Sequence, residues 1–122
     1  MTRTVLVVDD HDLNRQLLTM LVAAEGHAVV EAASVAEVRA RVADATPDVV
    51  LMDVNLPDGD GLDLVAELRR EPRFANVWIY AVTAYLMGEV HERAHRSGCD
   101  GLFEKPVDTT KLLPALRAPA RG

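Results

Sequence analysis

The chain has 122 residues, of which 49% are hydrophobic and 26% are charged, as in an ordinary globular domain. This length suits one domain with a single core, and the composition excludes disorder, collagen-like repeats and a coiled coil. The net charge is −6, from 13 Lys and Arg against 19 Asp and Glu. Because such a surface repels polyphosphate and anionic lipid, neither nucleic acid nor a membrane is an expected partner.

The cellular location is indicated by two weak signals. A single cysteine, Cys99, cannot form an internal disulfide, which fits a reducing compartment, and we expect it to be a small buried hydrophobe. The first apolar run is too short for the core of a signal peptide, and no run approaches the roughly 18 apolar residues of a membrane span. We therefore expect a cytoplasmic protein.

Short apolar runs rich in β-branched residues alternate with segments of helical spacing along the chain. The predicted strands are residues 4–8, 28–32, 49–52, 77–82 and 101–103. Apolar residues recur every three or four positions, as in amphipathic helices, in the segments 13–24, 35–42, 64–68, 86–94 and 112–116. The chain therefore alternates strand and helix five times.

Residues 49–52, Val-Val-Leu-Met, show no alternation of apolar and polar side chains. A strand of this kind is covered on both faces, which indicates a parallel sheet between two layers of helices. Right-handed crossovers then favour a doubly wound α/β fold, in which ligands bind outside the carboxyl ends of the strands.

Helix boundaries are marked by capping residues. Ser34 and Glu37 form a capping box, and Asp108 can cap the last helix. Gly26 and Gly98 stand where helices are expected to end.

The end of the chain breaks a local rule. Pro114 falls inside the last helical segment, where it removes a backbone donor and clashes with the preceding turn, so this helix is predicted to be short or kinked. Residues 118–122 are expected to fray. The predicted domain is the whole chain, 1–122, with this frayed tail.

Polar side chains follow the predicted strands: Asp9 and Asp10 after the first, Asp53 after the third, Thr83 after the fourth and Lys105 after the fifth. Parallel strands bring them to one edge of the sheet, where the three carboxylates repel one another and Mg²⁺ is the usual relief. A carboxylate beside such an ion can attack phosphorus and form an aspartyl phosphate. Lys105 supplies a positive charge for the phosphoryl oxygens, and Thr83 supplies a hydroxyl donor.

Over essentially its whole length, the sequence resembles the receiver domains of two-component response regulators. The segments that carry the resemblance are residues 5–10 (Val-Leu-Val-Val-Asp-Asp), 50–57 (Val-Leu-Met-Asp-Val-Asn-Leu-Pro), 59–61 (Gly-Asp-Gly), 81–84 (Ala-Val-Thr-Ala) and 105–106 (Lys-Pro). The resemblance implies a flavodoxin-like fold with a five-stranded parallel sheet in the order 2-1-3-4-5 and five helices.

The resemblance also implies roles for the polar residues at the sheet edge. Asp53 would be the phosphoacceptor, and Lys105 and Thr83 would contact its phosphoryl group. The implied ligands of Mg²⁺ are Asp10, Asp53, the backbone carbonyl of Asn55 and, through water, Asp9.

Three finer expectations come from the same resemblance. The Lys105–Pro106 peptide bond is expected to be cis. Tyr85 and Asn55 are expected to flank the path of the attacking water, and we hypothesise that the bulk of Tyr85 slows hydrolysis of the aspartyl phosphate.

One residue departs from the family pattern. Leu102 stands where receivers usually carry the Tyr or Phe that turns inward when Thr83 moves toward the phosphate. Phe103 cannot replace it, since adjacent strand residues point to opposite faces of a sheet. We therefore predict an atypical output face.

The remaining histidines raise one alternative. Residues 91–95, His-Glu-Arg-Ala-His, match the H-E-x-x-H pattern of zinc metalloproteases. His91 and His95, however, lie away from the apolar stripe of their helix and are expected to face solvent or the flank, and a catalytic zinc needs a third ligand and a cleft. His11 is expected at the mouth of the acidic pocket, and His27 at the surface or in a turn.

The predicted function is that of a phosphoacceptor switch and not of an enzyme, since the domain would assist only its own phosphorylation and dephosphorylation. The phosphodonor would be a sensor histidine kinase or a histidine phosphotransfer protein, and the output a downstream protein partner. Two origins stay open: a free-standing regulator like the single-domain cell-cycle regulators of this family, or a receiver from a hybrid kinase. A pseudo-receiver that binds partners without phosphorylation is the alternative, and Leu102 favours it.

Overall fold

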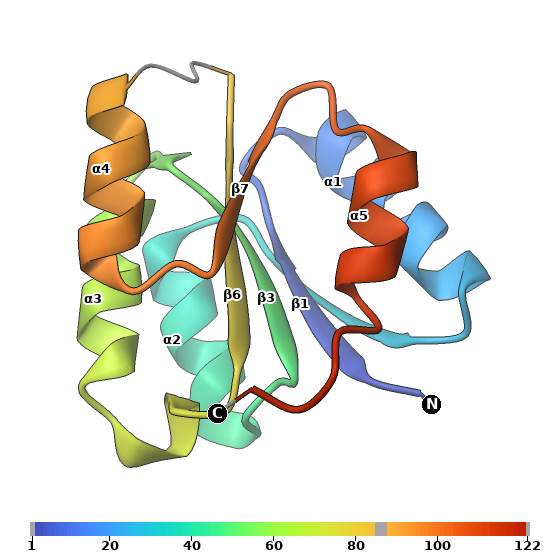
Figure 1. Cartoon of the computed structure of the whole chain (residues 1–122), viewed down its shortest axis with the longest axis horizontal. Coiled ribbons are helices and arrows are strands. Elements are labelled where there is room, and N and C mark those ends of the chain that lie inside the picture. The colour runs from blue at the N-terminus through green and yellow to red at the C-terminus, as the bar shows by residue number, and fades with distance from the viewer. Residues whose placement is uncertain (1, 85–87, 122) are drawn as a thin grey trace.

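The computed structural model describes residues 2–84 and 88–121 and shows a twisted parallel sheet with helices on both faces (Figure 1). The sheet has the order β2-β1-β3-β6-β7, and all neighbouring strands are parallel. Its strands are β1 (Thr4–Val8), β2 (Ala28–Ala32), β3 (Val49–Asp53), β6 (Trp78–Thr83) and β7 (Gly101–Glu104). This is the predicted 2-1-3-4-5 order, because β4 and β5 form a separate short hairpin.

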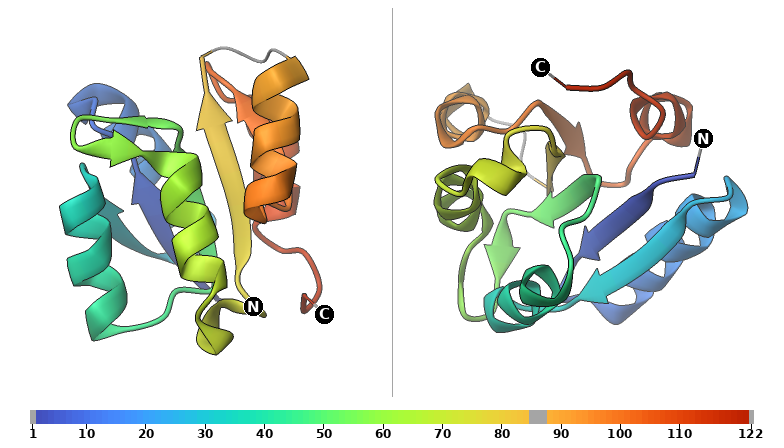
Figure 2. Two further views of the ribbon diagram at one scale, coloured as in Figure 1. Left: turned by 90° about the vertical axis from the view of Figure 1, so that its left-hand side faces the viewer. Right: turned by 90° about the horizontal axis from the view of Figure 1, so that it is seen from below.

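Helices cover the sheet in two groups, which the end-on view in Figure 2 separates. α1 (Asp12–Ala24) and α5 (Thr109–Ala115) pack on one face. The other face is covered by α2 (Val35–Asp44), α3 (Gly61–Arg69) and α4 (Gly88–Ser97). In the described part of the chain, no helix combines the length and apolar character needed to cross a bilayer.

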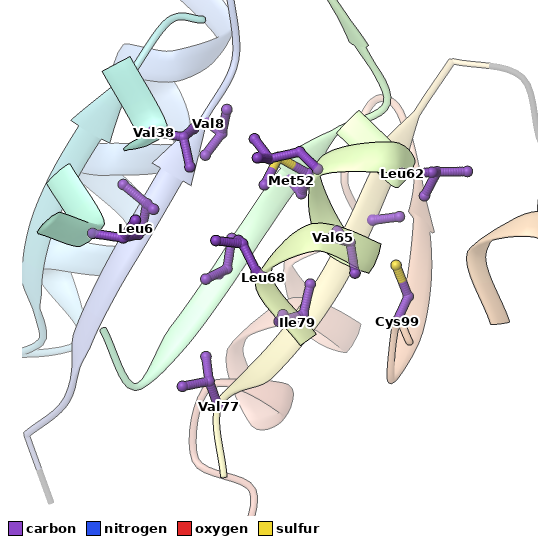
Figure 3. Close-up of a cluster of buried hydrophobic side chains, with 14 of the residues drawn as sticks. Leu6, Val8, Val38, Met52, Leu62, Val65, Leu68, Val77, Ile79 and Cys99 are labelled. Carbon is purple, nitrogen blue, oxygen red and sulfur yellow. The ribbon is translucent and has the colours of Figure 1, made fainter. Parts of the chain in front are cut away.

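The central strand β3 is buried along its entire length, as its uninterrupted apolar run predicts. Val49 and Leu51 pack with the α1 and α5 cluster, whereas Val50 and Met52 pack with the α2, α3 and α4 cluster. Figure 3 shows the second cluster, in which side chains of α3 meet those of the strands. Because each face of the sheet has its own core, the strand positions are firmly held, and so are the residues at their ends.

The predicted helix boundaries are confirmed by their caps. Ser34 Oγ accepts a hydrogen bond from the Glu37 amide, and Asp108 accepts one from the Thr110 amide. Gly98 has a φ of +103°, and a Cβ there would lie 2.7 Å from Arg69 Cγ, so glycine is required for two reasons.

The C-terminal segment contains a short last helix and a tail with long-range contacts. α5 is only seven residues long and contains Pro114, as expected. The fraying of the tail stays a prediction, and its described residues 118–121 lie against the amino edge of the sheet. Trp78 Nε1 donates to the Pro119 carbonyl at 3.0 Å, and Arg121 Nε donates to Asp100 Oδ1 at 2.7 Å. These partners are distant in the sequence, so local composition gave no sign of them.

Two short strands follow β3. β4 (Asn55–Leu56) and β5 (Gly59–Asp60) pair antiparallel, with Asn55 opposite Asp60. A 3₁₀ turn, η1 (Pro72–Phe74), follows α3. The sequence did not predict the hairpin, which connects the end of β3 to the start of α3.

Candidate functional site

The structure brings the predicted polar residues together at the carboxyl edge of the sheet. Asp9 follows β1, Asp53 ends β3, Thr83 ends β6 and Lys105 follows β7. The strand register places Asp53 beside Val82 and Thr83 beside Glu104, so the strand ends are nearly level. Asp9, Asp53 and Thr83 are all buried, with exposed fractions of 1%, 4% and 2%.

Three carboxylates form the acidic part of this site. Asp9, Asp10 and Asp53 each offer an oxygen, and these oxygens lie within 4.8 Å of one another. Asp9 Oδ1 accepts a hydrogen bond from the His11 amide at 2.9 Å, and Asp53 Oδ1 accepts one from the Asn55 amide at 3.2 Å.

The donor set fits Mg²⁺, which prefers hard oxygen ligands and keeps several waters. Asp9 Oδ2 is buried, and among the described residues it accepts no hydrogen bond of standard geometry, although Lys105 Nζ lies 3.1 Å away. Asp10 is exposed, which leaves room for water beside the cluster. Among residues 2–84 and 88–121, Asp9, Asp10 and Asp53 are the one group of three potential ligands found within such a distance.

Lys105 is the cation of the site. Its Nζ atom lies 3.1 Å from Asp9 Oδ2 and 3.2 Å from Asp53 Oδ2. The Lys105 amide donates to the Thr83 carbonyl at 2.8 Å, which ties the end of β7 to the end of β6. The following peptide bond, Lys105–Pro106, is cis, as the resemblance implies.

Burial and charge shift the pKa values of the central pair. Burial raises the pKa of Asp53 to about 6, with a further rise from Asp9, although Lys105 and its hydrogen bond oppose the shift. Burial acts to lower the pKa of Lys105, but Asp53 and Asp9 outweigh it, so the net pKa of Lys105 is raised. The lysine therefore stays charged, while three carboxylates share one ammonium, an imbalance that a divalent cation would correct.

Leu102 stands at the position where receivers usually carry an aromatic ring, and its side chain and that of Phe103 point to opposite faces of the sheet, as predicted. Leu102 is half-buried and packs with the α2, α3 and α4 cluster. Phe103 packs on the opposite face, with its ring centroid 5.5 Å from that of Tyr80. Phe103 therefore does not take the place of the missing ring. Tyr85, the residue expected to slow hydrolysis, lies outside the described residues.

Three of the four histidines are exposed, as expected, and the fourth is not. His91 and His95 are exposed on α4, and in the described chain they belong to no group of three potential ligands, so the metalloprotease alternative is not supported. His11 is exposed at the start of α1, beside the carboxylates. The expectation for His27 was wrong: it is 6% exposed, and its Nδ1 accepts the Arg3 amide hydrogen at 3.1 Å.

Sequence reasoning missed a second set of polar residues, next to the site. Asp58 and Asp60 lie in the hairpin after Asp53, and Asp60 forms an ion pair with Arg93 of α4 at 2.9 Å. A signal for Asp60 was present, since an Asp directly before a helical pattern is a common N-cap. No local pattern indicated its pairing with Arg93.

The comparisons with known proteins agree with this geometry. A family model, the response regulator receiver domain, matches residues 5–117. The chain therefore belongs to the response regulator receiver domain family.

Individual relatives match over nearly the whole chain. The polar-differentiation response regulator DivK of Brucella ovis is 29% identical over 118 residues, which cover 97% of this chain and 96% of DivK. The chemotaxis protein CheY4 of Vibrio cholerae is 28% identical with a TM-score of 0.89, over 96% of this chain and 98% of CheY4.

The fold alone is shared with a further structure, the receiver domain of a sensor histidine kinase from Pseudomonas aeruginosa PAO1. That domain, which holds a magnesium ion in its active-site cleft, is 24% identical with a TM-score of 0.86 over 96% of both chains.

Proposed function

We propose that this receiver domain is phosphorylated on Asp53. The observation that carries the proposal is the position of the Lys105 ammonium, 3.2 Å from Asp53 Oδ2 inside a cluster of three carboxylates. A carboxylate held in this way is placed to attack, and the ammonium is placed to receive the charge of an incoming phosphoryl group.

The reaction is a displacement at phosphorus. An Asp53 oxygen forms the new bond to phosphorus while the bond from phosphorus to the donor breaks. When the donor is a phosphohistidine, its imidazole nitrogen leaves with the bonding electron pair. Lys105 balances the negative charge on the transferred group, and we assign the Thr83 hydroxyl to donate a hydrogen bond to one of its oxygens.

The proposed Mg²⁺ ligands are Asp10, Asp53 and the backbone carbonyl of Asn55, with Asp9 acting through water. When bound, Mg²⁺ would supply neutralisation of charge on the phosphoryl oxygens. This assignment is supported by the close carboxylate oxygens and by their excess of negative charge over the ammonium of Lys105. Asp9 and Lys105 also keep the Asp53 side chain in place, since the ammonium bridges the two carboxylates.

We infer that the phosphodonor is a protein, either a sensor histidine kinase or a histidine phosphotransfer protein. Leu13, Leu17 and Met20 are exposed by 69%, 56% and 69% and form one stripe along α1. Leu17 also lines a hollow shared with Asp9 and Lys105, so the stripe reaches the edge of the site. A small phosphodonor would not need this apolar surface, whereas a protein donor could cover it.

The direct test is phosphorylation by acetyl phosphate in the presence of Mg²⁺, followed by intact mass spectrometry. The unaltered chain is expected to gain one phosphoryl group, and Asp53→Asn none. An Asp44→Asn variant serves as the matched control because Asp44 is an exposed carboxylate at the end of α2, outside the cluster. A wild-type chain that gains no mass would contradict the proposal and favour the phosphorylation-independent pseudo-receiver.

A further inference from the structure

The hairpin that follows Asp53 is packed directly against the backbone of the site. Its strands pair Asn55 with Asp60, so the two residues lie side by side. The Gly61 amide donates to the Val54 carbonyl at 2.7 Å. A Cβ added to Gly61, the residue after β5, would lie 2.0 Å from the Asp53 carbonyl oxygen. The Gly61 backbone therefore already lies against Asp53, and this end of the hairpin has no room to move closer to it.

Carboxylates in the hairpin fasten it to the helices of one face. Asp58 accepts hydrogen bonds from the Val35 and Ala36 amides, at 2.7 and 3.0 Å, at the start of α2. Asp60 Oδ1 accepts one from the Leu62 amide at 2.7 Å, which caps α3. The hairpin is therefore held at two points, independently of the acidic site.

Asp60 also makes a third connection, to α4. While Oδ1 caps α3, Oδ2 forms an ion pair with Arg93 Nη2 at 2.9 Å. α3 and α4 lie next to each other on the same face of the sheet (Figure 1). The Asp60 carboxylate thus joins α4 to the hairpin at the position that pairs with Asn55.

We propose that Arg93 is a positioning residue for the acidic site, and that through Asp60 it couples occupancy of the site to the position of α4. The proposal rests on the proposed function, because Asn55 is there assigned as a Mg²⁺ ligand. Any shift of α4 acts on Asp60, and the paired hairpin passes the shift to Asn55 and to the backbone of Asp53. Coupling is reciprocal, so a cation or phosphoryl group at the site must in turn shift the preferred position of α4.

Two observations favour a polar route of this kind in this chain. Leu102 offers no aromatic ring that could change its position between α4 and the site, since it is an aliphatic side chain packed in the core. Arg93 and Asp60 are 37% and 33% exposed, and an ion pair of that exposure adds little to global stability. Such a pair can break and re-form at small cost, which suits a connection that changes with the state of the site.

The test compares Arg93→Gln and Asp60→Asn with the unaltered chain. Asn is as good an N-cap as Asp, so Asp60→Asn removes the ion pair and keeps the cap of α3. Mg²⁺ affinity is measured by calorimetry, and amide hydrogen exchange along Ala94 to Ser97 is measured with and without Mg²⁺ and beryllofluoride. Each variant is expected to bind Mg²⁺ about three- to fivefold more weakly and to lose most of the exchange response of α4.

The double variant is expected to match Arg93→Gln, because Arg93→Gln already removes the ion pair with Asp60 together with the longer one, at 3.7 Å, with the exposed Asp63. Arg93→Lys is expected to recover part of the response, since it keeps the charge. Arg39→Gln is the matched control: Arg39 forms a surface ion pair with Glu67 at 2.8 Å between α2 and α3 and should leave both measurements unchanged.

Three outcomes would overturn the inference. If the wild type binds Mg²⁺ and accepts a phosphoryl group but Arg93→Gln retains its affinity and α4 response, the coupling is wrong and the proposed function stands. If the wild type neither binds Mg²⁺ nor gains a phosphoryl group, both are wrong. An equal loss in Arg39→Gln would also reject the coupling, because it would show a general effect of removing a surface ion pair.

Discussion

Two buried charge clusters in this protein have opposite balances of charge. At the amino edge, Asp100 is bound by two cations: Arg69 Nη2 at 2.9 Å and Arg121 Nε at 2.7 Å. At the carboxyl edge, the Asp9, Asp10 and Asp53 carboxylates share the single ammonium of Lys105. Both clusters join strands to neighbouring segments, but only the second has an excess of negative charge.

The difference extends to hydrogen bonding. Arg69 donates to the carbonyls of Gly98, Phe74 and Val77, and Asp100 also accepts from the Ile79 amide. At the carboxyl edge, by contrast, Asp9 Oδ2 and Asp53 Oδ2 share one ammonium, with Lys105 Nζ at 3.1 and 3.2 Å. A cluster in which each charge is matched and hydrogen-bonded stabilises the fold, whereas one with an excess of negative charge is arranged for a cation.

The largest effect is expected from breaking the first cluster. Arg69→Met is predicted to lower the free energy of unfolding by about 3 kcal/mol, because Asp100 loses a buried partner and three carbonyls lose their donor. Urea unfolding monitored by circular dichroism measures the change. Arg39→Met, which removes an exposed ion pair, is expected to change it by less than about 1 kcal/mol. Equal losses in the two variants would remove the structural role assigned to the Asp100 cluster.

A gain of stability is expected from relieving the second cluster. Asp53→Asn in Mg²⁺-free buffer at neutral pH is predicted to raise the free energy of unfolding by about 1–2 kcal/mol. The reason is that burial, which raises the pKa of Asp53 to about 6, makes its ionised form unfavourable in the folded state. Urea unfolding with and without Mg²⁺ checks this, since Mg²⁺ should stabilise the wild type more than the variant.

An exposed carboxylate provides the control for that gain. Asp44→Asn, at the end of α2, is expected to change stability by no more than about 0.5 kcal/mol. If Asp53→Asn were destabilising at neutral pH, the carboxyl edge would be a structural cluster like the one at the amino edge.

A smaller effect is expected at a third buried titratable group, His27. Among the described residues, it forms no ion pair with a carboxylate. Burial lowers the pKa of His27, with further lowering from Arg117 and Arg3, while Glu25 raises it. The unfolded chain therefore binds a proton at a higher pH than the folded chain does. Stability is then fully present above the ordinary histidine pKa of about 6.5 and is lost as pH falls through the lowered pKa of the folded protein.

Substitution of His27 should reduce the dependence of the unfolding free energy on pH. Unfolding free energies measured from about pH 7.5 to pH 5 are expected to fall less steeply in His27→Gln than in the wild type. His95→Gln, which replaces an exposed histidine, should keep the wild-type slope. Identical slopes in His27→Gln and the wild type would show that His27 is not held neutral by its surroundings.

The strands and the site were predictable because both follow from local patterns. The bounds predicted for β1 and β2 agree with the structure, since a short run rich in apolar and β-branched residues identifies a strand without reference to its partners. The meeting of Asp9, Asp53 and Lys105 required one further step, which was to read the alternation of strand and helix as a parallel sheet. Such a sheet places all its carboxyl ends at one edge.

Burial at the amino edge was not predictable in the same way. His27 has the composition of a turn around it, next to Gly26, yet it is buried, its Nδ1 accepts the Arg3 amide hydrogen, and Arg117 is near enough to lower its pKa. The contacts of the tail join Trp78 to Pro119 and Asp100 to Arg121, across 41 and 21 residues of chain. The two members of each pair are too far apart in the sequence for a local sequence pattern to include both.

The amino-acid sequence by itself determined which strands form the five-stranded sheet and which charged side chains follow them, because hydrophobic periodicity and helix capping act over a few neighbouring residues. Only the tertiary structure decided which of those charges are paired. Asp100 gained two arginines, Asp60 gained Arg93, and at the opposite edge Asp9 and Asp53 came to share Lys105. Ion pairs depend on distance in space, and the folded sheet sets that distance independently of separation along the chain.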